Sequence, residues 1–364
     1  ESAQDRILRR VHEYEVAQEL EERDAEEALA RLLAQPAPRR ETLVRNSERY
    51  QTYSLCLLLH KESVRQLFRA PEEGLALARL AVEIAEDPDL LVPSETLRSD
   101  VRGRSWAFLG NALRARFHYD ESEQAFRTAR KYLGEGSGDP LERAKLLDFE
   151  GQLRLYQRRF AEALRAFNRA ERIYLAVGDR HLAGGVLVNK GLTQHRMGEV
   201  DAAIRSQRQA LEWTDPSRDL RLHVAARHNL VYGLIEAGSF EEAAAQIPSL
   251  RDTHKALGDE ITLIRVRSLE AAIAEGLGHA GEALRHYEAA RGGYVAHSMV
   301  LDVAMTTLDM AAVYLRLNRT QETKQLASES LPLFRSLGLH REALAAFVAF
   351  QQAAEREVAT LELV

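Results

Sequence analysis

With 364 residues, the chain is long enough for two or three globular domains, and its 45% hydrophobic and 29% charged residues are ordinary for a soluble protein. The formal net charge of −6 at pH 7 provides no global positive field for direct binding of nucleic acid. The one cysteine, Cys56, excludes a disulfide framework and a cysteine-based zinc site. The sequence has neither an apolar run long enough to span a membrane nor the apolar core of a signal peptide, so we expect a cytoplasmic protein without a membrane partner.

The N-terminal part of the chain precedes any regular repeat. Residues 4–34 carry apolar side chains at helical spacing, and the Pro36-Ala-Pro38 break ends that pattern. We interpret residues 1–47 as a helical extension and linker that either caps the N-terminal end of the repeats or connects to a further domain. Residues 48–94 then form a divergent first helix pair, in which Pro71 stands at a helix start.

From residue 95 onward, the sequence has a period of about forty residues. A fixed period of this length predicts a solenoid in which each unit packs on its neighbours. We therefore expect six units of two antiparallel helices over residues 95–338, and a capping helix within residues 339–364. The register is marked by small residues spaced forty or forty-one apart: Ser122, Ala163, Ala203, Ala243, Ala283 and Thr323.

The helices of each expected unit are joined by short turns with recognisable signals. Asp139-Pro140 predicts a capping residue followed by a proline in the first helical position. Ser239 with Glu242 predicts a capping box. We expect first helices near 95–116, 141–157, 181–197, 220–237, 260–276 and 299–317. We expect second helices near 119–133, 160–177, 200–213, 240–256, 280–296 and 320–337, and a final helix near 341–357.

In the units of Ser122, Ala163 and Ala283, a small residue lies twelve positions before the register residue and an aromatic residue four positions after it, as in Gly151, Ala163 and Phe167. The small residue lets the two helices of a unit cross closely, and the aromatic ring fills the wedge to the next unit. This pattern resembles the tetratricopeptide repeat. The unit with Trp106, Leu109, Gly110, Phe126 and Ala129 around Ser122 shows the resemblance most fully.

The resemblance implies an all-α fold, a right-handed α-α superhelix whose first helices line a concave groove. A forty-residue unit is similar to the variant found in bacterial signalling proteins, including peptide-pheromone receptors and large activators of the maltose-regulator type. The residues around Leu43–Tyr53 also resemble repeat proteins with an upstream anti-sigma-like module.

In that register, Asn189 and Asn229 occupy equivalent places in adjacent units. A side-chain amide offers a donor and an acceptor, so it can hold a peptide backbone without reading the peptide's side chains. We expect Asn189, His228, Asn229 and Tyr232 to cluster at the middle of the array. The alternative is that the amides cap local backbone or bridge helices.

Other polar residues fall on the same expected face, and cations there suit an acidic group of a ligand. For each of these side chains taken alone, a solvated surface position is the favoured alternative. The further candidates for peptide or partner binding are Asn111, Gln152, Lys145, His195, Arg196, Arg265 and Asp309, with Arg104 as an additional cation.

The sequence contains no phosphate-binding glycine loop and no H-E-x-x-H metal motif. Cys56 and His60 share a helix face, but a buried structural cysteine explains Cys56 better than a catalytic dyad does. We therefore expect no enzyme activity, no cofactor and no metal.

The function that fits these features is recognition of a peptide or an extended partner segment, as a bacterial scaffold, sensor or regulator. Two alternatives stay open. One is an assembly subunit, with possible homo-oligomers. The other is the regulatory subunit of an effector enzyme, or an anti-sigma-like regulator, whose active module lies upstream or on a partner.

Overall fold

The computed structural model describes residues 23–67, 69–88, 90, 92, 94–258, 260–336 and 340–362, with the side chains of 336, 340–342 and 358–362 left out. The helix expected over residues 4–34 lies mostly outside this range, and residues 23–33 of it are helical. Throughout the described ranges the regular elements are helices, with no strand. The all-α fold class is confirmed.

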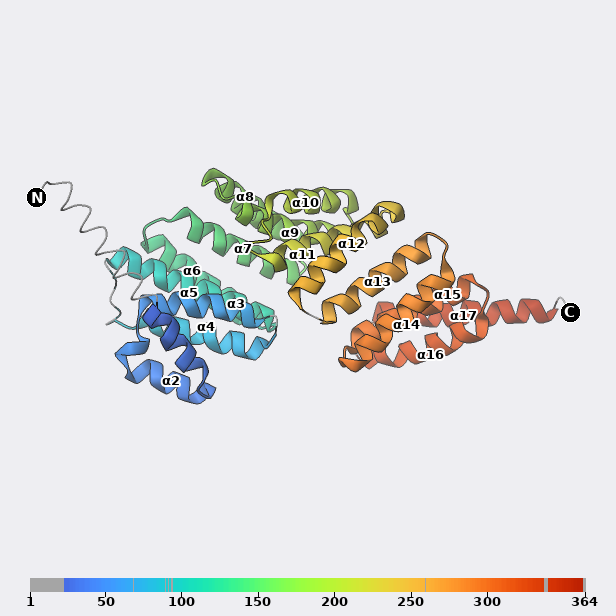
Figure 1. Ribbon diagram of the computed structural model, residues 1–364, viewed down its shortest axis with the longest axis horizontal. Helices are drawn as coiled ribbons and strands as arrows, with labels where there is room; N and C mark the ends of the chain where they lie inside the picture. The colour runs from blue at the N-terminus through green and yellow to red at the C-terminus, as the bar shows by residue number, and fades with distance from the viewer. Residues whose placement is uncertain are drawn as a thin grey trace, which may run out of the picture. The chain divides into compact units, whose positions relative to one another are not determined.

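The helices follow one another in pairs along the chain (Figure 1). The bounds of the six pairs between residues 95 and 336 agree with the sequence-based prediction within two residues. The last helix is five residues longer at its end than expected. The helices are α2 Ala37–Asn46, η1 Glu48–Tyr50, α3 Tyr53–Leu67, α4 Pro71–Glu86, α5 Glu95–Ala115, α6 Tyr119–Glu135, α7 Pro140–Tyr156, α8 Phe160–Ala176, α9 Arg180–Arg196, α10 Val200–Trp213, α11 Leu220–Glu236, α12 Phe240–Leu257, α13 Glu260–Gly276, α14 Ala280–Ala296, α15 Val300–Arg316, α16 Thr320–Ser336 and α17 His340–Glu362.

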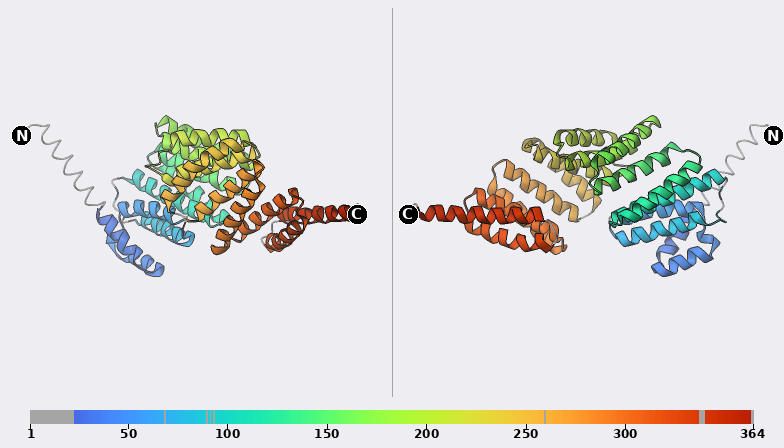
Figure 2. Two further views of the ribbon diagram at one scale, coloured as in Figure 1. Left: turned by 45° about the vertical axis from the view of Figure 1, so that its right-hand side comes forward. Right: turned by 180° about the vertical axis from the view of Figure 1, so that it is seen from behind.

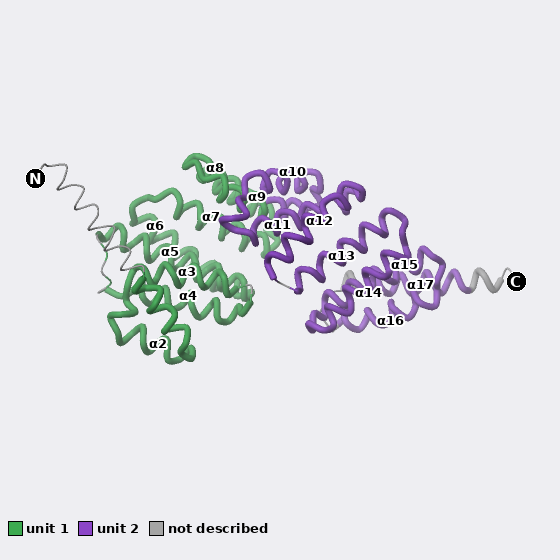
Figure 3. Tube along the Cα trace, viewed as in Figure 1, with its two compact units in different colours: residues 1–189 green, residues 190–364 purple. Residues whose placement is uncertain are grey.

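The chain divides within α9 into two compact units, residues 1–189 and residues 190–364 (Figure 3). Within each unit the two helices of a pair run antiparallel and lie side by side, as α5 with α6 and α13 with α14 do in every view (Figures 1 and 2). First helices of successive pairs also touch, as α5 does α7 and α11 does α13. We call the surface that these odd-numbered helices form in each unit its first-helix face.

The small register residues form the contact between the two helices of a pair. Ala163, Ala243 and Ala283 are completely buried, and Ser122 donates a hydrogen bond to the carbonyl oxygen of Gly110, 2.7 Å away. These positions are structural, because even one added methyl group is felt in a close-packed interior.

The aromatic residue of a unit packs against the small residue of its own helix pair. A Cβ atom on Gly151 would lie 2.6 Å from the ring of Phe167, and Gly110 meets Phe126 in the same way. Phe126 also packs in one cluster with Phe149 and Leu153 of the following helix. The ring therefore fills both the crossing within its unit and the wedge to the next.

The turn between the two helices of each pair contains one residue with left-handed backbone. Glycine occupies this position in the third to fifth pairs, at Gly198, Gly238 and Gly278. The other pairs use Phe117 and Arg158, whose side chains make that conformation costly, and Asn318, whose short polar side chain tolerates it. A residue with left-handed backbone therefore recurs with the same period of about forty residues as the sequence pattern.

The two predicted helix caps had different outcomes. The Asp139 side chain accepts a hydrogen bond from the backbone N–H of Leu141 at 2.8 Å, and Pro140 opens α7 as expected. The capping box at Ser239 is wrong, because its side chain makes no capping hydrogen bond. The tight turn after Gly238 holds Ser239 at ψ near 60°, outside the extended conformation that a capping residue needs.

Candidate functional site

In the first unit, Asp148 is the centre of a polar cluster on the first-helix face. The Asn189 amide nitrogen on α9 donates to Asp148 Oδ1 at 3.1 Å, and Gln152, one turn further along α7, donates to Asp148 Oδ2 at 3.3 Å. Burial raises the pKa of the Asp148 carboxyl, while Lys145 and the two amides act in the opposite direction. The Asn189 amide thus bridges α7 and α9, which was one of the two sequence-based alternatives for it.

Arg114 on α5 faces the same cluster. Its guanidinium donates through Nε and Nη2 to Asn111 Oδ1, at 3.2 and 2.9 Å, and lies over the Tyr156 ring at 5.1 Å. Burial lowers the pKa of Arg114, and the Asp148 carboxylate counteracts that shift. Because Asn111 is only 4% exposed and its oxygen accepts from Arg114, it positions this guanidinium rather than presenting a free amide.

In the second unit, a histidine, a tyrosine and a glutamate join α9 to α11. His195 Nδ1 lies 3.0 Å from Glu236 Oε2, and the His195 ring meets the Tyr232 ring edge-on with centroids 4.8 Å apart. Tyr232 remains 45% exposed, and Arg196 is exposed beside it on α9. This arrangement holds an aromatic surface rigidly while leaving it open to a ligand.

Asn229 stands one helical turn before Tyr232 and therefore on the same side of α11. Its side chain is partly buried, and among the described residues its amide makes no hydrogen bond. The Asn229 amide keeps its full capacity to donate and accept, whereas Asn189 donates to Asp148.

His228, the neighbour of Asn229 in sequence, lies against His254 on α12 with ring centroids 5.9 Å apart. Its Nδ1 is buried without a hydrogen-bond partner among the described residues. Burial lowers its pKa to about 4, helped by His254 and by Arg265 on α13. The ring is therefore neutral at physiological pH and belongs to the helix-packing layer behind Asn229.

Asp309 on α15 is partly buried beside Glu275 of α13. Burial raises its pKa to about 7, the Glu275 carboxylate adds to this, and Arg316 opposes it. Glu275 already accepts hydrogen bonds from Tyr287, at 2.8 Å, and from Arg316. Asp309 also helps to raise the pKa of Tyr232, so both groups act on the same face of this unit.

The remaining candidates are less engaged in these clusters. Arg265 is exposed on α13, and Arg104 forms an ion pair with the buried Glu142. Asn189 belongs to the first unit and Asn229, His228 and Tyr232 to the second, so the cluster of all four stays a prediction.

Sequence reasoning missed three residues that organise these clusters: Asp148, Arg114 and Glu236. Asp148 stands forty-one positions before Asn189, which is one repeat, and Arg114 stands three positions after Asn111. The repeat spacing therefore could have placed Asp148 next to Asn189. The prediction considered only amides at equivalent positions and did not consider this carboxylate.

Cys56 and His60 are buried in the core of the first unit, as the sequence indicated for Cys56. Ser105 Oγ lies 2.9 Å from His60 Nε2 and 3.4 Å from Cys56 Sγ. Burial raises the pKa of the thiol to about 11 and lowers that of the imidazole to about 3, so both groups are neutral. The cluster is a packing element.

The residues that the structure describes contain no helix that is long and apolar enough to cross a membrane. Within the same ranges, no three His, Cys, Asp or Glu side chains are grouped to hold a metal ion.

Comparison with known proteins supports the repeat assignment. A tetratricopeptide repeat model matches residues 185–215, and no curated protein matches the sequence. The resemblance to this repeat, inferred from the small and aromatic residues, is confirmed: the protein has the fold of a tetratricopeptide-repeat solenoid.

Three solved structures illustrate the likeness. A Rap protein in complex with competence and sporulation factor is 12% identical, with 83% of this chain and 98% of that chain covered and a TM-score of 0.54. NprR in complex with its cognate peptide NprX is 16% identical, with 82% and 87% covered and a TM-score of 0.57. Aspartyl phosphate phosphatase F from Bacillus subtilis is 12% identical, with 92% and 94% covered and a TM-score of 0.52. Identities this low show a shared fold.

Proposed function

We propose that this protein is a sensor or regulator that binds an extended peptide on a first-helix face, without catalysing a reaction itself. The observation that carries the proposal is Asn229, whose amide is partly buried and makes no hydrogen bond among the described residues. Neither polar atom of this amide is among the buried ones that lack a partner, so the amide is accessible to a ligand. A peptide backbone would supply both a carbonyl acceptor and an N–H donor to such an amide.

The surroundings of Asn229 suit an extended peptide. Tyr232, one turn away, offers an exposed ring that His195 holds in place, and aromatic rings provide large contact areas at small entropic cost. Arg196 supplies a cation on the same side, and Asp309 a carboxyl group. Backbone contacts at Asn229 would then give affinity, and the charged and aromatic groups would give specificity.

Asp309 favours a cationic group on the peptide. Its raised pKa of about 7 shows that its carboxylate is poorly compensated in the free protein. An ammonium or guanidinium group of the ligand would provide that compensation and hold Asp309 in the charged form. Binding of such a peptide near neutral pH would release a proton.

Fold comparison supports the peptide-binding proposal but does not decide on catalysis. NprR, whose fold is like this one, was solved in complex with its cognate peptide. Another protein with a similar fold is an aspartyl phosphate phosphatase. We propose a non-enzymatic role because the groups on both first-helix faces are arranged as hydrogen-bonding and ion-pairing clusters. A nucleophile with an adjacent base would instead be required for covalent catalysis.

The test is selection from a random peptide library on immobilised protein, with the wild type compared with Asn229→Ala. We expect the wild type to enrich a peptide family and Asn229→Ala to weaken its binding by about tenfold, the effect of one well-made pair of backbone hydrogen bonds. The matched control is Gln209→Ala, which removes an exposed amide from α10. Failure of the wild type to enrich any sequence, or equal losses in both variants, would contradict the proposal.

A further inference from the structure

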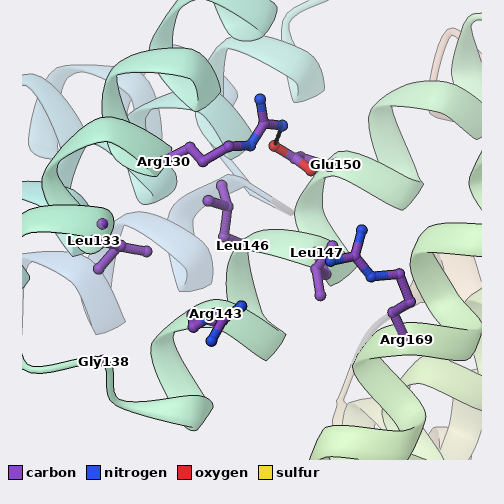
Figure 4. A pocket seen from close by; sticks show the side chains of 9 residues that line it. Arg130, Leu133, Gly138, Arg143, Leu146, Leu147, Glu150 and Arg169 are labelled. Atoms are coloured by element: carbon purple, nitrogen blue, oxygen red, sulfur yellow. Dashed lines mark hydrogen bonds and ion pairs between the residues drawn. The ribbon is translucent and has the colours of Figure 1, made fainter.

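A second candidate site involves the second helices of the first unit. A pocket of about 460 Å³ is formed there by α6, α7, α8 and the turn that leads into α7. Its size is within the range of ligand-binding pockets. The pocket is lined by Arg130, Leu133, Gly134, Gly138, Arg143, Leu146, Leu147, Glu150 and Arg169 (Figure 4).

The charged residues of this pocket are three arginines and one glutamate. Arg130 and Glu150 form an ion pair that closes one side (Figure 4). Burial raises the pKa of Glu150, and Arg130, Arg154 and Arg169 counteract that shift. Arg143 and Arg169 are exposed, and within the described ranges neither forms an ion pair. The guanidinium groups of Arg143 and Arg169 are thus available to pair with carboxylates of a ligand.

The floor of the pocket is apolar. Leu133 and Leu146 are each 5% exposed, and Leu146 lies between the Arg130–Glu150 pair and Arg143 in Figure 4. Leu147 stands beside Arg169 in the same view. A ligand that fits this surface therefore carries an apolar group together with anionic groups on its flanks.

The second unit has a pocket of the same design. Glu270 on α13 stands three forty-residue periods after Glu150, and it forms an ion pair with Arg251 of α12. This pocket, of about 500 Å³, is also lined by Leu263 and Val266 and by the further basic residues Lys255, Arg267 and His286. A partly buried glutamate paired with an arginine of the preceding helix, with further basic residues around it, thus recurs at the same place in two repeats.

We propose that the pocket around Arg143 and Arg169 binds an acidic segment of a partner protein, with an apolar side chain on Leu146 and carboxylates on the two arginines. The planar guanidinium group pairs with carboxylates in a two-pronged geometry. A nucleic acid is disfavoured, since Glu150 in the pocket repels a continuous row of phosphates and the leucines leave them without donors. The site includes second helices and is independent of the peptide proposed for Asn229.

The test uses fluorescence anisotropy at low ionic strength with a labelled decapeptide of glutamate and leucine. Its counterpart with glutamine in place of glutamate serves as the uncharged probe, and a single-stranded oligonucleotide serves as the phosphate probe. Full-length proteins are used, all carrying Lys255→Gln and Arg267→Gln to remove exposed cations of the second pocket. The test variant adds Arg143→Glu and Arg169→Glu. The matched control adds Arg165→Glu and Arg172→Glu, which are exposed on α8 outside the pocket.

We expect the test variant to bind the acidic peptide at least about tenfold more weakly than the parent, and the control variant to stay within about twofold. Arg143→Gln with Arg169→Gln, a milder pair, should also weaken binding, which keeps the test valid where charge reversal disturbs folding. Three results would each overturn the proposal: no binding of the acidic peptide by the parent, equal losses in the test and control variants, or tighter binding of the glutamine peptide or the oligonucleotide.

Discussion

Replacing Asp309 by asparagine should stabilise the protein, and more so at high pH. The pKa of the Asp309 carboxyl is raised from its usual value near 4 to about 7. The folded state therefore holds a proton that the unfolded chain releases, so this group lowers the stability as the pH rises from about 4 to about 7. Asparagine keeps the shape of the carboxyl group and does not titrate.

The size of the effect follows from the shift. About three pKa units correspond to roughly 4 kcal/mol of unfolding free energy at pH 8, and to less than half of that at pH 5. Since partial exposure and local relaxation reduce such values, we expect Asp309→Asn to gain on the order of 1–3 kcal/mol at pH 8 relative to its gain at pH 5.

Urea denaturation followed by circular dichroism at the two pH values measures this difference. Asp302→Asn is the control, because Asp302 lies on the same helix in its first turn, where a negative charge is favourable. The control variant should be slightly less stable than the wild type at pH 8. If Asp309→Asn were no more stabilising at pH 8 than at pH 5, the account of Asp309 as a poorly compensated carboxylate would be wrong.

Three further predictions concern packing, reactivity and acid stability. Gly151→Ala should destabilise by about 1–3 kcal/mol because its methyl group meets the Phe167 ring, whereas Gly292→Ala, with open space on its helix, should be neutral or stabilise by up to about 1 kcal/mol; thermal melts compare the two. Cys56 should resist a thiol reagent at pH 8 in the folded protein and react fully in denaturant, so rapid native labelling would contradict its burial. Because the pKa of His228 is lowered to about 4, the wild type should lose stability as the pH falls from about 6.5 to 4. In urea melts, His228→Gln should lose on the order of 1–3 kcal/mol less unfolding free energy over that pH range. Equal losses in the two proteins would contradict a buried, neutral His228.

The helices of the array were predictable from the sequence because small residues at a fixed period mark the places where two helices pack closely. Ala163, Ala243 and Ala283 are completely buried where two helices touch, and a close-packed interior leaves little room for a larger residue. The repeat register could therefore be extended to helix bounds. The Ser239 cap failed because it depends on the local value of ψ, which the residue types do not determine.

The candidate site was less predictable. The repeat register places a residue on a helix face, but it does not identify the side chains of neighbouring helices that contact that residue. Asn189 and Asn229 are equivalent in register, yet Asn189 donates to Asp148 of the preceding first helix, whereas the Asn229 amide makes no hydrogen bond among the described residues. Likewise, Asn111 is engaged by Arg114 from its own helix. Side-chain partners of this kind depend on neighbouring repeats, and each repeat carries its own residues.

The central claim is that an extended peptide binds over Asn229 and Tyr232. Hydroxyl-radical footprinting of the wild type, with and without a peptide selected from the random library, tests it most directly. The free protein should be oxidised at Tyr232, which is 45% exposed, and at Phe117, which is 69% exposed in a turn of the other unit. We predict that the peptide protects Tyr232 and leaves Phe117 unchanged. Unchanged oxidation of Tyr232 at saturating peptide would contradict the claim.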